Sequence, residues 1–230
     1  MPIIVFASSK GGAGKSTSAV LLATALAERG ATVTMIDADP NRPVSKWAKR
    51  ATIPAKMTVI ADVREDSILN SIDEAASRTA FVVVDLEGTA SMMVGIAVSR
   101  ADLVIIPTQG SHLDAEEAAK ALSLVKVQEQ VVRHPIPAVV LFTRTSSAIK
   151  PRGLTTIAAQ IERAGVTSLT AQIHEREAYR AMFAFGQTLS GLDPSQVPNL
   201  PAAIANAKAF MAEVVALLKS TTQPRAAEVA

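Results

Sequence analysis

The sequence contains no cysteine, only three histidines and few aromatic residues. The absence of cysteine excludes a disulfide scaffold, a thiolate metal site and a cysteine nucleophile, and three histidines leave little for a histidine-based metal cluster. Aromatic residues make up 3% of the chain, so a core must consist mainly of Ala, Val, Leu and Ile. Apolar residues make up 49% of the 230 residues and charged residues 19%, a composition that excludes a disordered chain.

Long apolar runs and a basic leader are also missing from the sequence. We find no run of the roughly 18 apolar residues that a membrane-spanning helix needs, and therefore predict none. The first apolar run, Ile3–Ala7, has no basic residue before it and stops at Ser8. This pattern indicates a first strand rather than a signal peptide, so we expect a cytoplasmic protein.

Short runs of β-branched and apolar residues alternate with alanine-rich stretches of helical length. Most of the short runs are apolar at every position, which is typical of strands buried on both faces of a parallel sheet. The alternation predicts a doubly wound α/β fold, with a mostly parallel sheet flanked by helices. The predicted strands are Ile3–Ala7, Thr32–Ile36, Thr58–Ala61, Phe81–Val84, Leu103–Pro107 and Ala138–Phe142. The predicted helices are Ser16–Glu28, Val44–Ala51, Ser67–Ser77, Asp114–Val132, Leu154–Ala164, Arg176–Phe185 and Ala202–Lys219.

A glycine-rich segment, Lys10–Thr17, lies between the first predicted strand and the first predicted helix. Backbone N–H groups in such a turn can surround phosphate oxygens, and the N-terminus of the following helix adds its dipole. Lys15 would reach the β- and γ-phosphates, and the Ser16 hydroxyl would coordinate Mg²⁺. The strict phosphate-binding pattern, G-x-x-x-x-G-K-[ST], has a glycine where this chain has Ser9, so the match to it is imperfect. The residues that would surround the phosphates are Gly11, Gly12, Ala13, Gly14 and Lys15.

Carboxylates follow two of the predicted strands. Asp37 and Asp39 come after the second strand, and Asp85 comes directly after the fourth. Because the carboxyl ends of parallel strands meet at the edge of the sheet where ligands bind, we expect these residues beside the glycine-rich turn. A carboxylate after an apolar strand has the pattern of a Walker B motif, which holds Mg²⁺.

Together these motifs resemble those of the ParA/MinD ATPases, which are P-loop NTPases of the SIMIBI class. Lys10–Thr17 resembles the family's deviant Walker A box, Asp37–Asn41 its second motif, and Val82–Gly88 its Walker B motif. The late segment Ile173–Met182, followed by Gly186, is similar to the family's I-x-x-R-x-x-Y/F segment. Since the chain begins almost at its first strand, it resembles the small ParA proteins that lack an N-terminal DNA-binding domain. Some conjugative DNA-transfer ATPases share this form.

The resemblance implies a role for each matched residue. Lys10 would be the signature lysine that crosses a dimer interface to the partner's ATP, while Lys15 binds phosphate in its own subunit. Thr17 would lie near the α-phosphate. Asp39 matches the acid that orients the attacking water, and Asp37 would lie close to the metal ion.

Two positions depart from the family's pattern. Glu87 adds a negative charge directly after the Walker B residues, and we interpret it as a solvated residue rather than one that slows hydrolysis or faces a partner. Gly88 has the spacing of a D-x-x-G switch, whose N–H could sense the γ-phosphate. The family often places Asn at the end of the strand that here ends in Thr143 and Arg144, so either residue is a candidate for adenine recognition.

The formal net charge of +2 is unevenly distributed. The region from Pro137 to the end carries nine basic and six acidic residues, a net charge of +3. ParA relatives bind DNA non-specifically as ATP dimers through basic residues in this part of the chain, and such contacts are sensitive to salt. The alternative is that these residues are scattered solubilising charges. The candidates for DNA binding are Arg144, Lys150, Arg152, Arg163, Arg176 and Arg180, of which the last two are spaced to share a helix face.

A second basic stretch lies near the N-terminus. Residues 40–61 contain five basic residues and no acid. Trp47, within this stretch, is interpreted as a packing anchor rather than a base-stacking platform. The five basic residues are Arg42, Lys46, Lys49, Arg50 and Lys56.

The resemblance predicts a Mg²⁺-ATP-dependent switch built as a single P-loop ATPase domain over residues 1–219, with a flexible tail over 220–230. It would form a homodimer around ATP, bind DNA non-specifically on the nucleoid, and hydrolyse ATP slowly when a ParB-like or other cargo-adaptor protein stimulates it. One alternative is a MinD-like positioning ATPase, which needs a membrane-binding C-terminal helix. We interpret that helix as packed on the domain, so a membrane partner is not expected. Another alternative is a dethiobiotin-synthetase-like enzyme, which needs a second substrate pocket.

Overall fold

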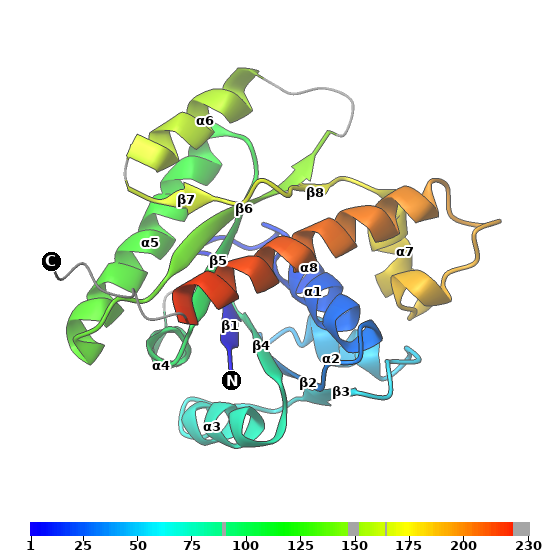
Figure 1. Ribbon diagram of the computed structural model, residues 1–230, viewed down its shortest axis with the longest axis horizontal. Helices are drawn as coiled ribbons and strands as arrows, with labels where there is room; N and C mark the ends of the chain where they lie inside the picture. Colours follow the sequence, from blue (N-terminus) through cyan, green and yellow to red (C-terminus); the bar gives the residue numbers. More distant parts are fainter. Residues whose placement is uncertain (89–90, 147–151, 164, 223–230) are drawn as a thin grey trace, which may run out of the picture.

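A parallel β-sheet lies in the middle of the molecule, with helices on both of its faces (Figure 1). The computed structural model describes residues 1–88, 91–146, 152–163 and 165–222. Seven strands follow the order β3-β2-β4-β1-β5-β6-β7, and β8 pairs with β6. All of these pairings are parallel, which confirms the predicted doubly wound α/β fold. The strands are β1 (Ile3–Phe6), β2 (Val33–Ala38), β3 (Met57–Ile60), β4 (Phe81–Leu86), β5 (Leu103–Thr108), β6 (Ala138–Thr145), β7 (Thr167–Ser168) and β8 (Ile173–His174).

The helices form two layers, each with its own hydrophobic cluster against one face of the sheet. Strands β1, β2 and β5 are buried along their whole length because both faces are covered. The helices on one face are α1 (Lys15–Glu28), α2 (Pro43–Ala48), α7 (Glu177–Phe185) and α8 (Leu200–Thr222). Those on the other face are α3 (Ile68–Arg78), α4 (Met92–Ser99), α5 (His112–Val132) and α6 (Arg152–Arg163).

All six predicted strands and all seven predicted helices are present, with shifted ends. The prediction missed α4, β7, β8 and a 3-10 turn at Leu189–Gly191. Helix α4 is short and contains Gly95, which lies so close to Gln128 that a Cβ atom there would be 3.1 Å from the amide nitrogen. The sequence of α4 gives little helical signal, because it is short and contains a glycine. Packing between α3 and α5 stabilises it.

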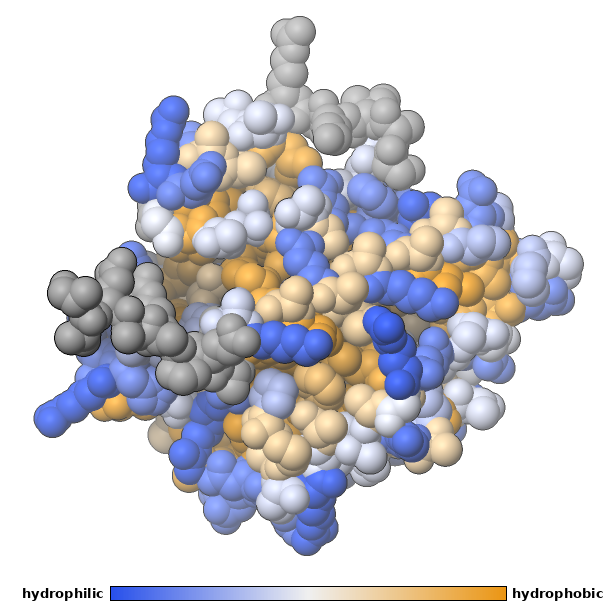
Figure 2. Space-filling view, viewed as in Figure 1, coloured by the Kyte–Doolittle hydropathy of each residue, from blue (hydrophilic) through white to orange (hydrophobic). Residues whose placement is uncertain are grey.

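Among the described residues, Leu200–Ser220 of helix α8 are long and apolar enough, by length and composition, to cross a membrane. The core helix of a globular protein passes the same test. Phe210, Met211 and Val214 are buried against α1 and the sheet, as the packed interpretation predicted. The outer face of α8 is a row of small apolar residues between lysines, seen as pale atoms among blue ones in Figure 2. The helix also continues through Thr222, past the boundary predicted at Lys219.

Trp47 confirms its interpretation as a packing anchor. Its side chain is fully buried, and its indole nitrogen donates a hydrogen bond to the carbonyl of Gln187 at 3.0 Å. Its ring packs at a tilt against Phe183, with ring centroids 6.3 Å apart. This contact joins α2 to α7, and both helices border the site described next.

Candidate functional site

The glycine-rich turn lies at the carboxyl edge of the sheet, between β1 and α1. Gly12 and Gly14 have φ angles of +80° and +90°, a conformation that glycine adopts without strain. With these two glycines the turn reverses direction and directs the N-terminus of α1 at a cavity of about 420 Å³. The residues of the turn that line this cavity are Gly11, Gly12, Gly14, Lys15, Ser16 and Thr17.

The predicted carboxylates lie beside this turn. Asp37 and Asp85 are neighbours in the register of β2 and β4, and Asp85 is also level with Phe6 at the end of β1. Asp39 lines the same cavity and accepts a hydrogen bond from the backbone N–H of Asn41 at 2.8 Å. The structure thus brings together both acidic motifs and the turn, as expected from the parallel topology.

Burial controls the ionisation of this cluster. Asp85 is completely buried, and burial raises its pKa to about 7, against the opposing effects of Ser16 and Lys15. Desolvation also lowers the pKa of Lys15, although the carboxylates of Asp85, Asp39 and Glu87 oppose that shift. Burial raises the pKa of Asp37 in spite of its hydrogen bonds from Ser45. The site therefore holds carboxylates that are costly to ionise until a cation balances them.

The carboxylate oxygens fit a metal ion. Both oxygens of Asp85 and Oδ1 of Asp37 are buried, and none accepts a hydrogen bond of normal geometry. Buried oxygens without donors are the ligands that a hard cation such as Mg²⁺ prefers. In the part of the chain that the structure describes, no three His, Asp or Glu side chains form a cage for a metal ion. A Mg²⁺ ion here would thus need oxygens from a bound phosphate as well.

Glu87 lies next to the predicted metal site. It is partly exposed and lines the same cavity as Lys15 and Asp39. Strand β4 ends at Leu86, so the next residue emerges at the carboxyl edge, toward the glycine-rich turn. Gly88 approaches that turn even more closely, because a Cβ atom there would lie 2.9 Å from the backbone nitrogen of Gly11.

Lys10 comes directly before the residues of the turn that line the cavity, and its side chain is half exposed. Its ammonium group is 3.1 Å from Oδ1 of Asp114, at the start of α5. Burial alone would raise the pKa of Asp114, but hydrogen bonds from Ser111 and Lys10 outweigh it and hold that pKa below its usual value. Ser9, which departs from the strict glycine pattern, donates its hydroxyl hydrogen to Glu117 at 2.7 Å.

The segment from Gln109 to Glu117 was not singled out in the sequence. Besides the contacts of Asp114 and Glu117, it supports the turn through Gln109, whose amide donates to the carbonyl of Gly12 at 3.1 Å. The signal that could have identified it is its position after β5, at the same edge of the sheet as the other motifs.

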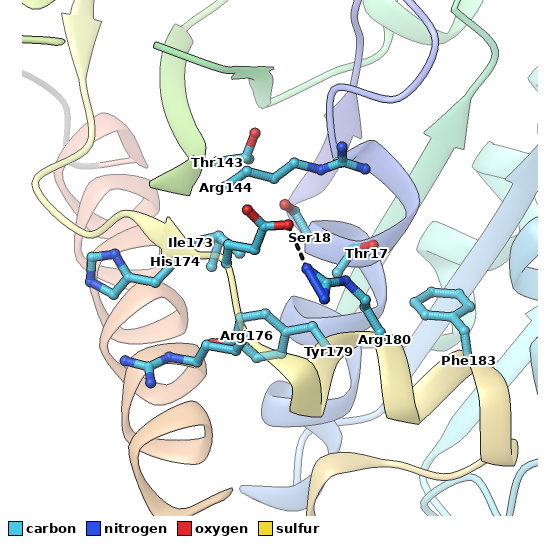
Figure 3. A pocket seen from close by; sticks show the side chains of 12 residues that line it. Thr17, Ser18, Thr143, Arg144, Ile173, His174, Arg176, Tyr179, Arg180 and Phe183 are labelled. Atoms are coloured by element: carbon cyan, nitrogen blue, oxygen red, sulfur yellow. Dashed lines mark hydrogen bonds and ion pairs between the residues drawn. The ribbon is translucent and has the colours of Figure 1, made fainter. Parts of the chain in front are cut away.

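A second cavity of about 400 Å³ adjoins the first, and Gly14, Thr17 and Arg144 line both (Figure 3). Thr143 is buried at its wall and donates its hydroxyl hydrogen to the carbonyl of Ala13 at 2.8 Å. Arg144 has a φ of +52°, a conformation that is uncommon for a residue with a side chain. Residues of the late segment close the far side of this cavity, namely Ile173, His174, Glu175, Arg176, Tyr179, Arg180 and Phe183.

The residues predicted to contact DNA do not form one cluster. Arg176 has extended backbone angles before α7 begins, so it does not share a helix face with Arg180, and Figure 3 shows the two side chains pointing in different directions. Arg180 is paired with Glu175 at 2.6 Å and Glu177 at 3.1 Å. Arg163 is exposed on α6, which covers the other face of the sheet. Lys150 and the side chain of Arg152 lie outside the described residues.

Comparisons with known proteins identify the family of the chain. The family model described as "VirC1 protein" matches residues 1–224. The chain is 44% identical over 223 residues to "Protein ParA" of Rhizobium radiobacter, covering 97% of this chain and 99% of that one. It is 30% identical over 228 residues to "Protein virC1" of Rhizobium rhizogenes, covering 95% and 96% of the two chains. A putative plasmid partition protein from Borrelia burgdorferi, solved with AMPPNP, matches with a TM-score of 0.70 at 20% identity, covering 94% of this chain and 99% of that one.

Proposed function

Since the chain belongs to the VirC1 family and to the wider ParA/MinD family of ATPases, we propose that it is a Mg²⁺-ATP-dependent dimerising switch for DNA partition. One observation carries this proposal. The P-loop, Lys15 and Asp39 line one cavity, Asp85 is buried beside them in the register of β2 and β4, and the side chain of Lys10 remains half exposed outside the cavity lining. An enzyme that acts alone needs only the first four elements, whereas an exposed lysine next to the P-loop can reach a second subunit.

In this proposal the P-loop N–H groups and Lys15 bind the β- and γ-phosphates of ATP. Ser16, Asp37 and Asp85 would hold Mg²⁺, and the ion would neutralise charge on the phosphate oxygens. Asp39 orients the attacking water, because its carboxylate lies at the cavity wall and is fixed by the N–H of Asn41. The second cavity takes the base, with Thr143 holding the P-loop backbone and Arg144 lying between base and phosphates.

Lys10 would stabilise the partner's phosphates across the dimer interface, as an arginine finger does. To do so it must leave Asp114. An ion pair with a half-exposed lysine is worth only about 0–1 kcal/mol, so the pair with Asp114 does not prevent the movement. Binding of ATP and formation of the dimer would then depend on each other.

In this proposal the ATP dimer binds the DNA of the nucleoid through contacts to its phosphates, which need no particular base sequence. A ParB-like or other cargo-adaptor protein would trigger hydrolysis and release the dimer. The second candidate function, a ligase-type enzyme of the same fold, is favoured by a third cavity of about 360 Å³. This cavity shares Asp39 and Pro40 with the phosphate cavity, so a small second substrate could lie beside ATP.

We expect duplex DNA of arbitrary sequence to bind the protein with ATP and Mg²⁺ and to bind more weakly with ADP. The reason is that a dimer presents each phosphate-binding surface twice, which raises the apparent affinity without any new contact. Gel retardation at several salt concentrations measures this directly, and vesicles of anionic lipid in place of DNA test the MinD-like alternative. Equal retardation with ATP, ADP and no nucleotide would contradict the switch. Fast turnover with a small acid or amine would instead support the ligase.

A further inference from the structure

The basic stretch at residues 40–61 contains five basic residues and no acidic one. It carries a charge of +5, while the whole chain has +2, so the remaining residues sum to −3. In the fold this stretch forms α2, the connection to β3 and β3 itself, which is the edge strand of the sheet. It thus places five of the chain's 23 basic residues at the β3 edge of the sheet, away from α6.

Four of these cations form what we call the α2 basic surface, which consists of Lys46, Lys49, Arg50 and Lys56. All four are exposed, and none forms an ion pair with a carboxylate that the structure describes. Lys46, Lys49 and Arg50 follow the spacing i, i+3, i+4 along α2 and the residues that end it, so they share one face. On the elements beside this surface, Asp62 pairs with Arg42, and Glu28 accepts a hydrogen bond from Ser190.

The surface is held in place by neutral partners. Arg50 donates to the carbonyl of Phe183 at 2.6 Å, at the end of α7. Lys56 donates to the carbonyl of Gly30 at 2.9 Å, just past the end of α1. Backbone carbonyls orient these cations without neutralising them, so their charge remains available to an anion.

The chemistry of the surface favours the phosphate backbone of DNA over an acidic protein. A stable protein interface usually has a desolvated apolar centre, whereas the exposed face of α2 offers cations alone. Non-specific DNA binding requires only that cations neutralise phosphates. The arginine at position 180, by contrast, is already neutralised by two carboxylates of its own chain.

The surface is also connected to the nucleotide site. Ser45 of α2 donates both its backbone N–H and its hydroxyl hydrogen to Oδ2 of Asp37, at 2.7 and 2.6 Å. The carboxylate that neighbours Asp85 at the metal site therefore anchors the helix that carries Lys46 and Lys49. A shift in Asp37 on nucleotide binding would be transmitted to α2 by these two hydrogen bonds.

We infer that the α2 basic surface is a phosphate-binding surface for duplex DNA, in addition to the residues from the C-terminal part of the chain. The inference rests on the proposed function, because it concerns how the same switch holds its DNA. Two copies of the surface in an ATP dimer would engage one duplex together and raise its retention on DNA.

The test compares the wild type with the double variant Lys46→Gln, Lys49→Gln in DNA retardation with ATP and Mg²⁺. We expect affinity to fall about tenfold or more near 0.1 M salt, and the slope of log affinity against log salt to decrease by about 4, since the two copies in the dimer neutralise four fewer phosphates. The variant Lys46→Arg, Lys49→Arg should bind like the wild type. Thermal unfolding should be unchanged in both, because the two side chains are exposed.

Two further variants distinguish a failure of this inference from a failure of the proposed function. Arg163→Gln removes an exposed cation on α6, and Phe185→Ala removes an exposed aromatic side chain at the end of α7. If the wild type binds DNA and the lysine variant binds equally well while Arg163→Gln weakens binding, the inference is wrong and the proposed function stands. If Phe185→Ala weakens binding as much as the loss of both lysines, the surface recognises more than phosphate and the inference is also wrong. If the wild type does not bind DNA with any nucleotide, both proposals fail.

Discussion

Replacing Asp39 with alanine should leave ATP binding intact and slow hydrolysis at least about 100-fold, the usual size of an effect at a residue that positions or deprotonates the nucleophile. Asp39 lies at the wall of the phosphate cavity but outside the buried pair of Asp37 and Asp85, so its loss does not empty the metal site. Phosphate release at saturating ATP measures the rate, and titration with a fluorescent ATP analogue measures binding.

The matched control is Asp66→Ala, which removes an exposed carboxylate that lines none of the three cavities. Its hydrolysis rate should equal that of the wild type. An unchanged rate for Asp39→Ala would mean that another group orients the attacking water. Glu87 is then a candidate, because it lines the same cavity.

The Asp85→Asn variant should be more stable than the wild type when no nucleotide is bound, by an amount that grows between about pH 4 and about pH 7 and is constant above that. Burial raises the pKa of Asp85 to about 7, above the value of 3.8 that an unfolded chain would show. A raised carboxyl pKa means that the folded state binds the extra proton between these values, so this contribution to stability is lost as pH rises through 7. At pH 8 the wild type carries a buried charge that Asn does not.

The expected gain at pH 8 is up to about 4 kcal/mol, the linkage free energy of a pKa shift from 3.8 to about 7, which already includes the opposing effect of Lys15. This corresponds to at most about 8–16 °C in the melting temperature of a chain of this size, with about a third of the gain present at pH 5 and almost none below pH 4. Adding Mg²⁺ and ATP should stabilise the wild type strongly and the variant weakly, because the variant lacks a metal ligand. A variant that melts below the wild type at pH 8 would show that Asp85 is already neutralised in the free protein.

The parts of the site that were predictable from sequence are those made by contiguous residues. The P-loop, Asp37, Asp39 and Asp85 each follow an apolar strand, and parallel strands bring their carboxyl ends together, so local pattern and topology were sufficient. The strands themselves were predictable because burial on both faces requires apolar residues at every position.

Contacts between distant segments were not predictable in this way. The pair of Lys10 and Asp114 joins residues 104 positions apart, and nothing in either segment indicates the other. The sequence predicts that Arg176 and Arg180 share a helix face because the predicted helix begins at Arg176. Helix α7 instead begins at Glu177, so Arg176 lies outside it, and both arginines line the second cavity. The position of Glu87 at the cavity wall was not predictable either, because it depends on where β4 ends.

The most direct test of the switch is the mass of the Asp39→Ala protein in solution, measured by light scattering with Mg²⁺ and ATP. The account predicts a mass of twice 24.1 kDa with ATP and 24.1 kDa with ADP. Adding Lys10→Ala should return the mass with ATP to that of one chain while the nucleotide stays bound, whereas Asp114→Asn should keep the dimer. A dimer that persists after Lys10→Ala, or a single chain that binds ATP and never pairs, would contradict it.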